Sequence, residues 1–425
     1  MIAAVVVVGA VIVTAAGELP AGRHRTPSAT LTALNDSYAH APGATTVAGT
    51  GTPGFNGDGR AAADSELDAP SGIAEGAAGD LFIADSGNCR VREIPATTGV
   101  SFGRRVRAGA MVTVVGGSCG RANPPPSALA VDGGGDLFIA SGPDALVEEL
   151  PARNTTTFGM SLTAGKLTVV AGTGVTGYGG DGGRATRSLL DDPTGVAVDA
   201  SGDLLVSDTG NCRLRLVAAT SGTHFGVTMS AGHIYTVAGN GICGSSGDDG
   251  PAGDAELWDP GALTVDPDGD VLVADQGNRT IRELAAHSGS FFGVAIATDA
   301  LGTVAGEGSY GPYLVDGLSA TGEIAELNFP SGLALDREGN LYIADGDMHA
   351  IRFVAATTTT LRGAEAAADD MYIAAGALSI HQLHNRTTWI QTRMIDPTGL
   401  AMAPDGQLVY SDSGADVVRV LPAGS

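Results

Sequence analysis

The sequence predicts an all-β protein, a propeller of six four-stranded blades closed into a ring, and three observations support this prediction. A 24-residue phrase recurs six times along the 425-residue chain, beginning at Pro70, Pro126, Pro193, Pro260, Pro330 and Pro397. Each copy holds short apolar runs separated by glycine-containing turns, as expected of strands. One more apolar run precedes each copy, which makes four strands per unit.

The first three strands of a unit lie within the phrase itself. In the first copy they are expected around Ile73, at 81–84 and at 91–94, with Gly79 in the first turn and an Asp-x-Gly-Asn turn before the third strand. The first two runs are apolar on successive residues, a pattern typical of strands buried on both faces. Glycine supplies the positive φ that tight turns require.

The fourth strand is predicted from runs resembling Thr-Val-Ala-Gly, at 46–49, 113–116, 169–172, 236–239, 303–306 and 373–376. The last copy of the phrase ends at Val420, five residues before the final Ser425, so no fourth strand follows it. The run at 46–49 precedes the first copy and has no unit of its own. We therefore expect the N-terminal strand to complete the C-terminal blade, which removes the exposed sheet edges of an open ring.

The phrase, with its recurring order Pro-x-Gly, Asp-x-x-Gly and Ala-Asp-x-Gly-Asn, resembles the NHL repeat. The interleaved Thr-Val-Ala-Gly-Thr-Gly segments are similar to those of secreted NHL propellers of high-GC bacteria. The resemblance covers residues 45–425 and implies a six-bladed β-propeller. It implies no single activity, because some members of the family are scaffolds and others resemble lyases.

The composition limits the kind of partner. The chain has 23 Lys and Arg against 47 Asp and Glu, a net charge of −24, although only 16% of its residues are charged. An acidic surface argues against nucleic acid and against anionic membrane, which both require basic patches. It favours solubility or the attraction of cations, and we expect a monomer.

The N-terminal region is predicted to be separate from the propeller. Residues 1–17 read as a signal peptide or short anchor, 18–44 as a linker and 45–425 as the propeller. The apolar stretch 2–16 is shorter than the ~20 residues of a membrane span and ends in small residues that suit cleavage. No Lys or Arg precedes it, which is unusual for a leader. We expect an extracellular or cell-surface protein.

The four cysteines follow the repeat. Cys89 and Cys212 stand at the start of third strands, and Cys119 and Cys243 follow the next fourth strands, at separations of 30 and 31 residues. Because these two strands should be antiparallel, the spacing favours disulfides Cys89–Cys119 and Cys212–Cys243. Metal binding is the alternative, disfavoured because the pairs lie in separate blades and no Cys-x-x-Cys is present.

Aspartate and arginine also recur at fixed places. An Asp ends the second strand in five copies, and an Arg follows seven residues later: Asp85, Asp208, Asp275, Asp345 and Asp412 with Arg92, Arg215, Arg282, Arg352 and Arg419. The second copy has Ser141 and Glu148 instead. Since both residues are lost together, we interpret them as interacting groups with a structural role.

A second acidic set lies in the loops between the fourth strand and the next first strand. It comprises Asp58, Asp181, Asp248 and Asp249. These loops should share a face with the Asp-x-Gly-Asn turns, where oxygen ligands could bind Ca²⁺. The full EF-hand pattern is absent, and a solvated acidic rim is the alternative.

Two segments break the repeat, and breaks are where function is often added. The loop 116–126 is short and rich in proline, which predicts a notch. The loop 378–389 holds His381 and His384, which could bind Zn²⁺ or act as base and acid, or form an ordinary surface pair. Its Arg386 and Trp389 could contact a ligand, although Trp389 could also belong to the core.

We therefore predict a secreted, non-catalytic binding or scaffold propeller that recognises a protein or a cell-surface glycan. No catalytic residues are assigned and no cofactor is expected, with Ca²⁺ or Zn²⁺ as the metals that the acidic and histidine sites could take. The alternative is a metal-dependent lyase or hydrolase, with its site on the acidic face or in the axial channel. The recurring Phe-Gly pairs at 102–103, 158–159, 225–226 and 292–293 are expected to pack on the opposite face.

Overall fold

The computed structural model describes residues 44–117, 119–120, 125–309, 317–322, 325–361, 364–376 and 394–421. The chain divides into Met1–Ala39 and His40–Ser425, and all described elements belong to the second part. The predicted leader 1–17, nearly all of the predicted linker, and the loop with His381, His384, Arg386 and Trp389 lie outside the described residues. Within the described ranges, no helix is long and apolar enough to cross a membrane.

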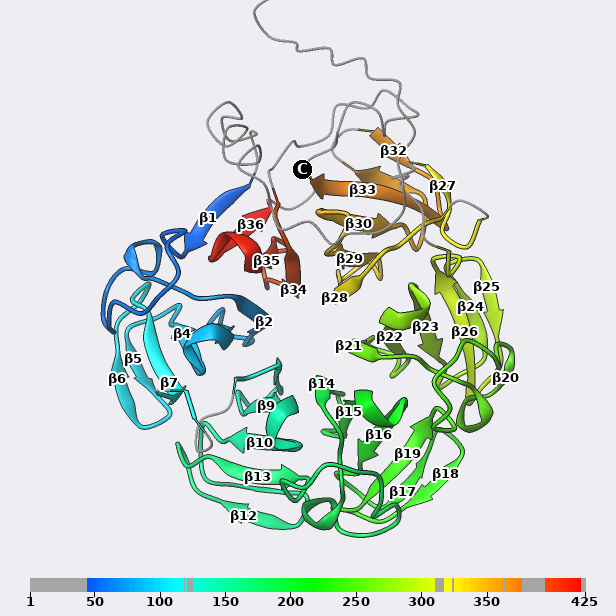
Figure 1. The fold of residues 1–425 in the computed structure, drawn as a ribbon, viewed down its shortest axis with the longest axis horizontal. Coiled ribbons are helices and arrows are strands. Elements are labelled where there is room, and N and C mark those ends of the chain that lie inside the picture. Colours follow the sequence, from blue (N-terminus) through cyan, green and yellow to red (C-terminus); the bar gives the residue numbers. More distant parts are fainter. Residues whose placement is uncertain are drawn as a thin grey trace, which may run out of the picture. The chain divides into compact units, whose positions relative to one another are not determined.

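Six antiparallel sheets stand as blades around a central axis, with the strands of each blade following one another outwards (Figure 1). Blade 1 consists of β2 (Pro70–Glu75), β3 (Leu81–Asp85), β4 (Arg90–Ile94) and β7 (Val112–Gly116). Blade 2 consists of β8 (Ala128–Val131), β9 (Leu137–Ser141), β10 (Leu146–Leu150) and β13 (Thr168–Ala171). Blade 3 consists of β14 (Pro193–Val198), β15 (Leu204–Asp208), β16 (Arg213–Val217) and β19 (Ile234–Ala238).

The remaining three blades repeat this plan, two of them with a short fifth strand. Blade 4 holds β21 (Pro260–Val265), β22 (Val271–Asp275), β23 (Thr280–Leu284), β26 (Ala300–Ala305) and β20 (Gly250–Pro251). Blade 5 holds β28 (Pro330–Leu335), β29 (Leu341–Asp345), β30 (Ala350–Val354), β33 (Asp370–Gly376) and β27 (Leu318–Ser319). Blade 6 holds β34 (Pro397–Met402), β35 (Leu408–Asp412), β36 (Val417–Leu421) and β1 (Thr45–Ala48).

The ring closes as the sequence predicts. Strand β1 pairs antiparallel with β36, with Thr46 opposite Arg419 and Ala48 opposite Val418. The N-terminal strand is therefore the outer strand of the C-terminal blade, and the six-bladed all-β fold is confirmed (Figure 1). Closure in this way ties the two ends of the propeller together, because blade 6 cannot complete its sheet without both.

The Pro-x-Gly that begins four of the six repeats is explained by crowding at the axis. The first strands of neighbouring blades approach so closely that a Cβ on Gly195 would lie 2.0 Å from the carbonyl oxygen of Gly261. A Cβ on Gly332 would lie 2.2 Å from the oxygen of Thr398 in the same way. Glycine is required here by the close approach of two backbones rather than by its torsion angles. The second strands next to them are buried over most of their length, as the continuous apolar runs indicate.

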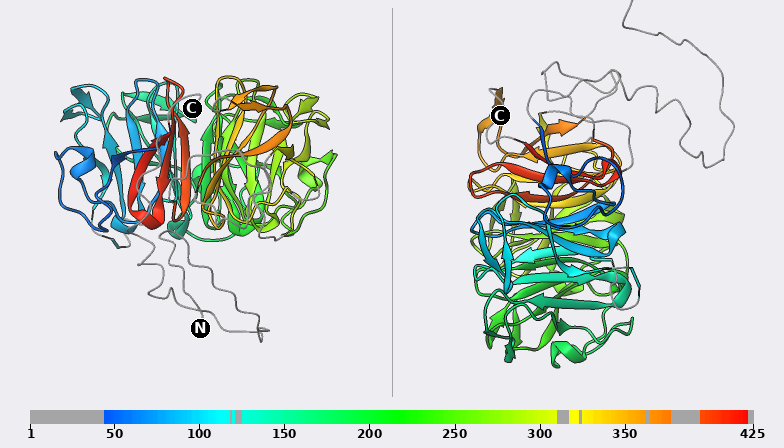
Figure 2. Two further views of the ribbon diagram at one scale, coloured as in Figure 1. Left: turned by 90° about the horizontal axis from the view of Figure 1, so that it is seen from above. Right: turned by 90° about the vertical axis from the view of Figure 1, so that its left-hand side faces the viewer.

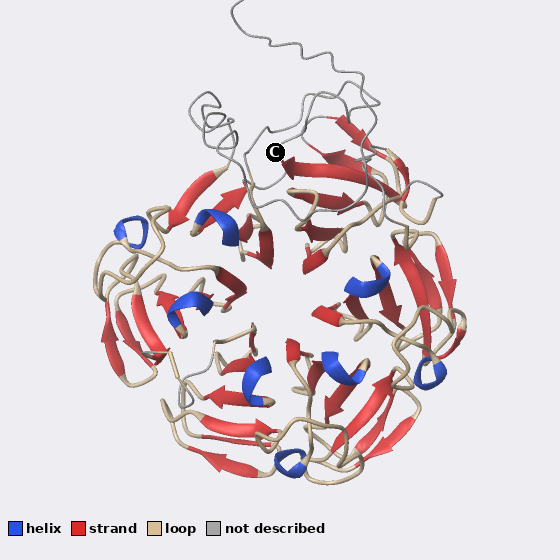
Figure 3. Cartoon of the chain, viewed as in Figure 1, coloured by secondary structure: helices blue, strands red, loops and turns tan. Residues whose placement is uncertain are grey.

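In every blade except blade 5, the turn between the second and third strands forms a short 3-10 helix over the inner part of the blade, and in blades 1, 3 and 4 this turn is Asp-x-Gly-Asn (Figure 3). These helices are η2 (Ser86–Asn88), η3 (Gly142–Asp144), η5 (Thr209–Asn211), η7 (Gln276–Asn278) and η8 (Ser413–Ala415). We call the side of the ring that carries them the turn face. Three others, η1 (Ala62–Asp64), η4 (Ala185–Arg187) and η6 (Ala252–Asp254), lie in the loops that lead into blades 1, 3 and 4.

The long connections between third and fourth strands form two-stranded hairpins. They are β5 (Gly99–Ser101) with β6 (Arg104–Val106), β11 (Thr155–Thr157) with β12 (Met160–Leu162), β17 (Gly222–His224) with β18 (Val227–Met229), β24 (Gly289–Phe291) with β25 (Val294–Ile296), and β31 (Thr359–Leu361) with β32 (Ala364–Ala366). They lie on the outer rim, outside the fourth strands, rather than over a face of the ring (Figures 1 and 2).

The Phe-Gly pairs are the two-residue turns of these hairpins. Phe102 and Gly103 both have positive φ, 44° and 77°, as a primed hairpin turn demands. The strained phenylalanine is held by packing, because its ring meets that of Phe82 edge-on at 5.9 Å between centroids. Phe158 meets Phe138 in the same way at 6.4 Å. These two pairs therefore pack the hairpins against the blades.

Candidate functional site

The repeated Asp and Arg meet within each blade that has them. In blade 3, a guanidinium nitrogen of Arg215 lies 2.9 Å from a carboxylate oxygen of Asp208, and both side chains are fully buried. The corresponding distances are 3.4 Å in blade 1, 3.2 Å in blade 4 and 4.0 Å in blade 5, and Arg419 contacts Asp412 in blade 6. Arg215 stands opposite Val206 on the neighbouring strand, which places its head beside the end of that strand.

The acidic loops supply a second carboxylate to the same arginines. Asp58 lies 3.2 Å from the other terminal nitrogen of Arg92, and Asp181 and Asp248 bind Arg215 and Arg282 in the same way. Asp248 also accepts a hydrogen bond from the Thr303 hydroxyl at 2.8 Å. In blades 1, 3 and 4 the guanidinium is thus held between a buried and a half-exposed carboxylate, which its planar arrangement of donors suits.

These contacts shift the ionisation of the carboxyl groups. Burial raises the pKa of Asp275 to about 6, although Asn278, the Trp258 backbone and Arg282 all act to lower it. Burial also raises the pKa of Asp181, but Arg215 and hydrogen bonds from Thr236 and Tyr178 outweigh it and leave the pKa below its usual range. The buried member of the pair therefore depends on its arginine to stay charged.

The residues suggested as metal ligands are placed differently from one another. Asp58, Asp181 and Asp248 bind arginine, while Asp249 is exposed. Within the part of the chain that the structure describes, no three His, Cys, Asp or Glu side chains are grouped to hold a metal ion. Metal binding at these loops stays a prediction, as does any role of His381 and His384, which lie outside that part.

Both expected disulfides are present. Cys89 is joined to Cys119 and Cys212 to Cys243, with Cα atoms 5.1 and 5.4 Å apart. Each bond fastens the turn at the start of the third strand to the segment after the fourth strand. Their presence in two of six blades is typical of proteins that fold in an oxidising compartment.

Blades 1 and 3 share a further contact, an arginine stacked on an aromatic ring, that was not predicted from the sequence. The guanidinium of Arg90 lies over the ring of Phe55, 3.6 Å from its centroid, and that of Arg213 lies 4.2 Å from the centroid of Tyr178. The aromatic residue comes from the loop before the blade, and the arginine begins the third strand. This stack covers the outer part of the blade next to the disulfide.

Blade 4 lacks both members of the stack. At the aligned positions it has Ser245 in place of the aromatic residue and Thr280 in place of the arginine, and Arg279 stands where blades 1 and 3 have cysteine. A groove of about 830 Å³ occupies this place. It is lined by Ser245, Asp248, Trp258, Gly277, Asn278, Arg279, Thr280, Arg282, Val294, Thr303, Gly306, Glu307, Gly308 and Thr321.

The indole of Trp258 is the main apolar surface of this groove. It rests on Gly277, where a Cβ would lie 2.4 Å from the indole, so only glycine permits the ring to lie flat there. The Trp258 backbone N–H donates to Asp275 at 2.7 Å, which fixes the residue to the structural network. With 48% of its surface exposed, the ring presents a fixed aromatic plane beside polar groups of both charges.

Another opening lies on the axis and is lined by the first strands of all six blades. Its volume is about 100 Å³. The hydroxyls that face it are used to join neighbouring blades: Ser331 donates to the Pro397 carbonyl at 2.9 Å, and Thr398 donates to the Pro70 carbonyl at 3.3 Å. The axial opening therefore offers less room and fewer uncommitted groups than the groove on blade 4.

Sequence reasoning missed the groove. It singled out the breaks at 116–126 and 378–389. Gly116 and Pro126, at the two ends of the first break, line a cavity between blades 1 and 2. Trp258 stands where blades 1 and 3 have Asp68 and Asp191, and Ser245 stands where they have aromatic residues. A comparison of blade 4 with blades 1 and 3, position by position through the loops, would have found both.

Comparisons with known proteins agree with the repeat. The NHL repeat family matches residues 190–215 and 327–352, which contain the first two strands and part of the third in blade 3 and in blade 5. Teneurin-3 of Mus musculus is 31% identical over 134 residues, which is 28% of this chain. The match spans only 5% of the length of Teneurin-3.

Solved structures share the fold at low sequence identity. An auxiliary nutrient binding protein from Bacteroides thetaiotaomicron is 11% identical with a TM-score of 0.57, over 89% of this chain and 76% of that one. A second such protein, from Bacteroides ovatus, is 12% identical with a TM-score of 0.55, over 91% and 77%. A protein of unknown function from Bacteroides thetaiotaomicron is 15% identical with a TM-score of 0.56, over 89% and 75%. With six registered copies of the phrase, a closed ring of six blades and a family match in two of them, the chain is a six-bladed β-propeller that carries NHL repeats.

Proposed function

We propose that this protein is an extracellular, non-catalytic binding propeller and that it recognises a glycan in the groove on blade 4. The observation that carries the proposal is the exposed indole of Trp258, held flat over Gly277 beside charged and amide side chains. Sugar rings bind to proteins by laying an apolar face on an aromatic plane while their hydroxyls meet polar groups, and the groove offers both.

The disulfides and the net charge support an extracellular location and a neutral glycan. The two disulfides support an extracellular location, because such bonds persist in oxidising environments. The net charge of −24 favours a neutral glycan over an acidic one, since an acidic polymer would be repelled. The groove volume of about 830 Å³ falls within the range of small-ligand sites and would hold a short stretch of a polysaccharide.

Affinity electrophoresis tests this function directly. The full chain is run in native gels that contain soluble neutral polysaccharides, and migration should be retarded by at least one of them. Trp258→Ala should abolish the retardation, while Ile242→Ala, which removes another exposed apolar side chain outside the residues that line the groove, should not. If both variants migrate like the parent chain in the retarding gel, the groove is not the glycan site.

The alternative of a metal-dependent lyase or hydrolase requires a resident metal. It is tested by the metal content of the purified protein and by thermal unfolding with Ca²⁺ and Zn²⁺, because a ligand of the native state raises stability. A stoichiometric metal that is lost in His381→Ala with His384→Ala would favour this alternative over the binding module.

A further inference from the structure

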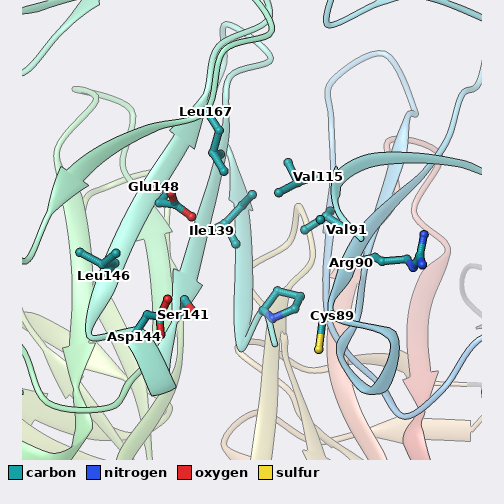
Figure 4. Close-up of a pocket in the computed structure, with 12 residues that line it drawn as sticks. Cys89, Arg90, Val91, Val115, Ile139, Ser141, Asp144, Leu146, Glu148 and Leu167 are labelled. Atoms are coloured by element: carbon teal, nitrogen blue, oxygen red, sulfur yellow. The ribbon is translucent and has the colours of Figure 1, made fainter. Parts of the chain in front are cut away.

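A cavity of about 90 Å³ lies between blades 1 and 2 (Figure 4). Its hydroxyl and carboxylate groups come from blade 2: Ser141 at the end of β9, Asp144 in η3 and Glu148 in β10. Across from them, Val91 and Val115 of blade 1 form an apolar wall, and Ile139 and Leu167 of blade 2 add aliphatic surface next to the polar groups. The cavity is therefore acidic on one side and apolar on the other.

The other blades fill the corresponding place with their own arginine. Ser141 aligns with Asp208 and Glu148 aligns with Arg215, whose guanidinium is fully buried between two carboxylates in blade 3. In blade 2 the arginine has become an acid and its buried carboxylate has become a hydroxyl. The pocket that receives a guanidinium in five blades is thus retained in blade 2 without the guanidinium.

The polar groups of the cavity lack partners in the described part of the chain. Ser141 is only 2% exposed, and its buried hydroxyl makes no hydrogen bond. The carboxylates of Asp144 and Glu148 likewise have no hydrogen bond or ion pair to any described residue. Burial and the charge of Asp144 raise the pKa of Glu148 above its usual value, as expected of a carboxylate without a countercharge. An unpartnered buried hydroxyl in a native protein calls for an explanation, and a bound group supplies one.

We propose that this cavity binds a guanidinium group carried on an aliphatic stem. The head would lie between Glu148, Asp144 and the Ser141 hydroxyl, and the stem would run along Val91 and Val115. A guanidinium fits better than a simple ammonium, because its five donors can serve two carboxylates and a hydroxyl at once. Arg90 also borders the cavity, but its guanidinium stacks on Phe55 and points away from it (Figure 4). This inference is independent of the glycan site on blade 4.

The guest could be a free small molecule or the arginine side chain of a partner polypeptide. Isothermal titration of the full chain with butylguanidinium, and separately with a capped pentapeptide that has one central arginine, distinguishes these sources. Saturable binding of both probes at one site indicates an arginine side chain. Binding of butylguanidinium alone indicates a small molecule. The matched probe butylurea has the same stem without the charge and should not bind.

Two variants and one control test the site itself. Glu148→Gln should weaken butylguanidinium binding by about tenfold or more, the loss of one charged hydrogen-bond partner. Ser141→Asp with Glu148→Arg rebuilds the pair found in the other blades, so the chain should stay folded while binding is lost. Asp249→Asn removes one exposed charge in another blade and should leave binding unchanged. The proposal is overturned if butylguanidinium does not saturate the parent chain, or if Glu148→Gln and Asp249→Asn bind it equally well.

Discussion

Blades 3 and 4 are built on the same repeat but differ in what covers them. Blade 3 is closed by a disulfide and by Tyr178 stacked on Arg213. Blade 4 has neither, and the indole of Trp258 borders an open groove instead. Beneath these differences both blades keep the same buried aspartate and arginine. The two blades thus share the buried network and differ in the cover, and under the proposed function the difference in cover makes the site.

The largest expected effect concerns the network that the two blades share. Asp208→Ala and Asp275→Ala should each lower the free energy of unfolding by about 3–5 kcal/mol, because each leaves a buried arginine without its buried partner. Denaturant titration followed by circular dichroism measures the loss. Asp249→Ala, on an exposed residue, is the control and should change little. A normal stability in the two network variants would show that the pairs are not structural.

Blade 3 has a disulfide and blade 4 has none, and removal of this bond should have the next largest effect on stability. Cys212→Ser with Cys243→Ser should cost about 2–4 kcal/mol, as expected for a bond that closes a loop of 31 residues. Thermal unfolding measures it, with the parent chain in reductant as a second route to the same state. Since blade 4 holds its fold without such a bond, the variant should still fold and give native circular dichroism. A variant that does not fold would show that blade 3 depends on its cover in a way that blade 4 does not.

The disulfide and the Asp–Arg pairs could both be predicted from the sequence, whereas the groove could not. Alignment of the repeats was enough to pair the cysteines and to associate Asp208 with Arg215, because both patterns recur or vanish together. It could not reveal the groove, because nothing in the sequence states that Tyr178 lies on Arg213. The contact becomes visible only in the folded chain, where Tyr178 of a loop lies over Arg213, 35 positions later. Ser245 and Thr280 of blade 4 can then be recognised as replacing both members of one contact. The same holds for the cavity of blade 2, whose apolar wall comes from blade 1.

A third difference lies in the third strands, where blade 3 has Leu216 and blade 4 has Glu283. Glu283 is 1% exposed, and its carboxylate has no hydrogen-bond partner among the described residues. Burial, with the charges of Asp270 and Asp266, raises its pKa from 4.5 to about 9. From pH 5 to pH 9 the folded protein therefore holds a proton that the unfolded chain releases, so stability falls as pH rises.

Glu283→Leu, which copies blade 3, should remove part of this dependence. We expect the stabilisation to be larger at pH 8 than at pH 5 by roughly 2–4 kcal/mol, because at pH 8 the folded parent keeps a proton on Glu283 that its unfolded chain has released, which is worth about 1.4 kcal/mol per pH unit. Unfolding free energies across pH 5–9 measure this. Some slope should remain, because burial also raises the pKa of Glu93 and Glu149 to about 7. Parallel pH profiles for variant and parent would contradict the assignment to Glu283.

The variant with the smallest expected effect on stability is the most direct test of the comparison between blades 3 and 4. Ser245→Tyr with Thr280→Arg gives blade 4 the stacked pair of blade 3, which should fill the groove. A partly exposed stack of this kind contributes about 0.5–1 kcal/mol, so the melting temperature should rise slightly or stay the same. Retardation by neutral polysaccharide should nevertheless be lost, although Trp258 is unchanged.

Each single variant should have an intermediate effect, because neither side chain fills the space without the other. Ser245→Tyr alone places a ring with no arginine beneath it, and Thr280→Arg alone places a cation with no ring above it. Retained glycan binding in the double variant, with a crystal structure that shows the stack formed, would mean that the groove is only a gap in the cover of blade 4. Loss of binding with unchanged stability would show that the absence of the aromatic–arginine stack is necessary for blade 4 to bind, in addition to Trp258.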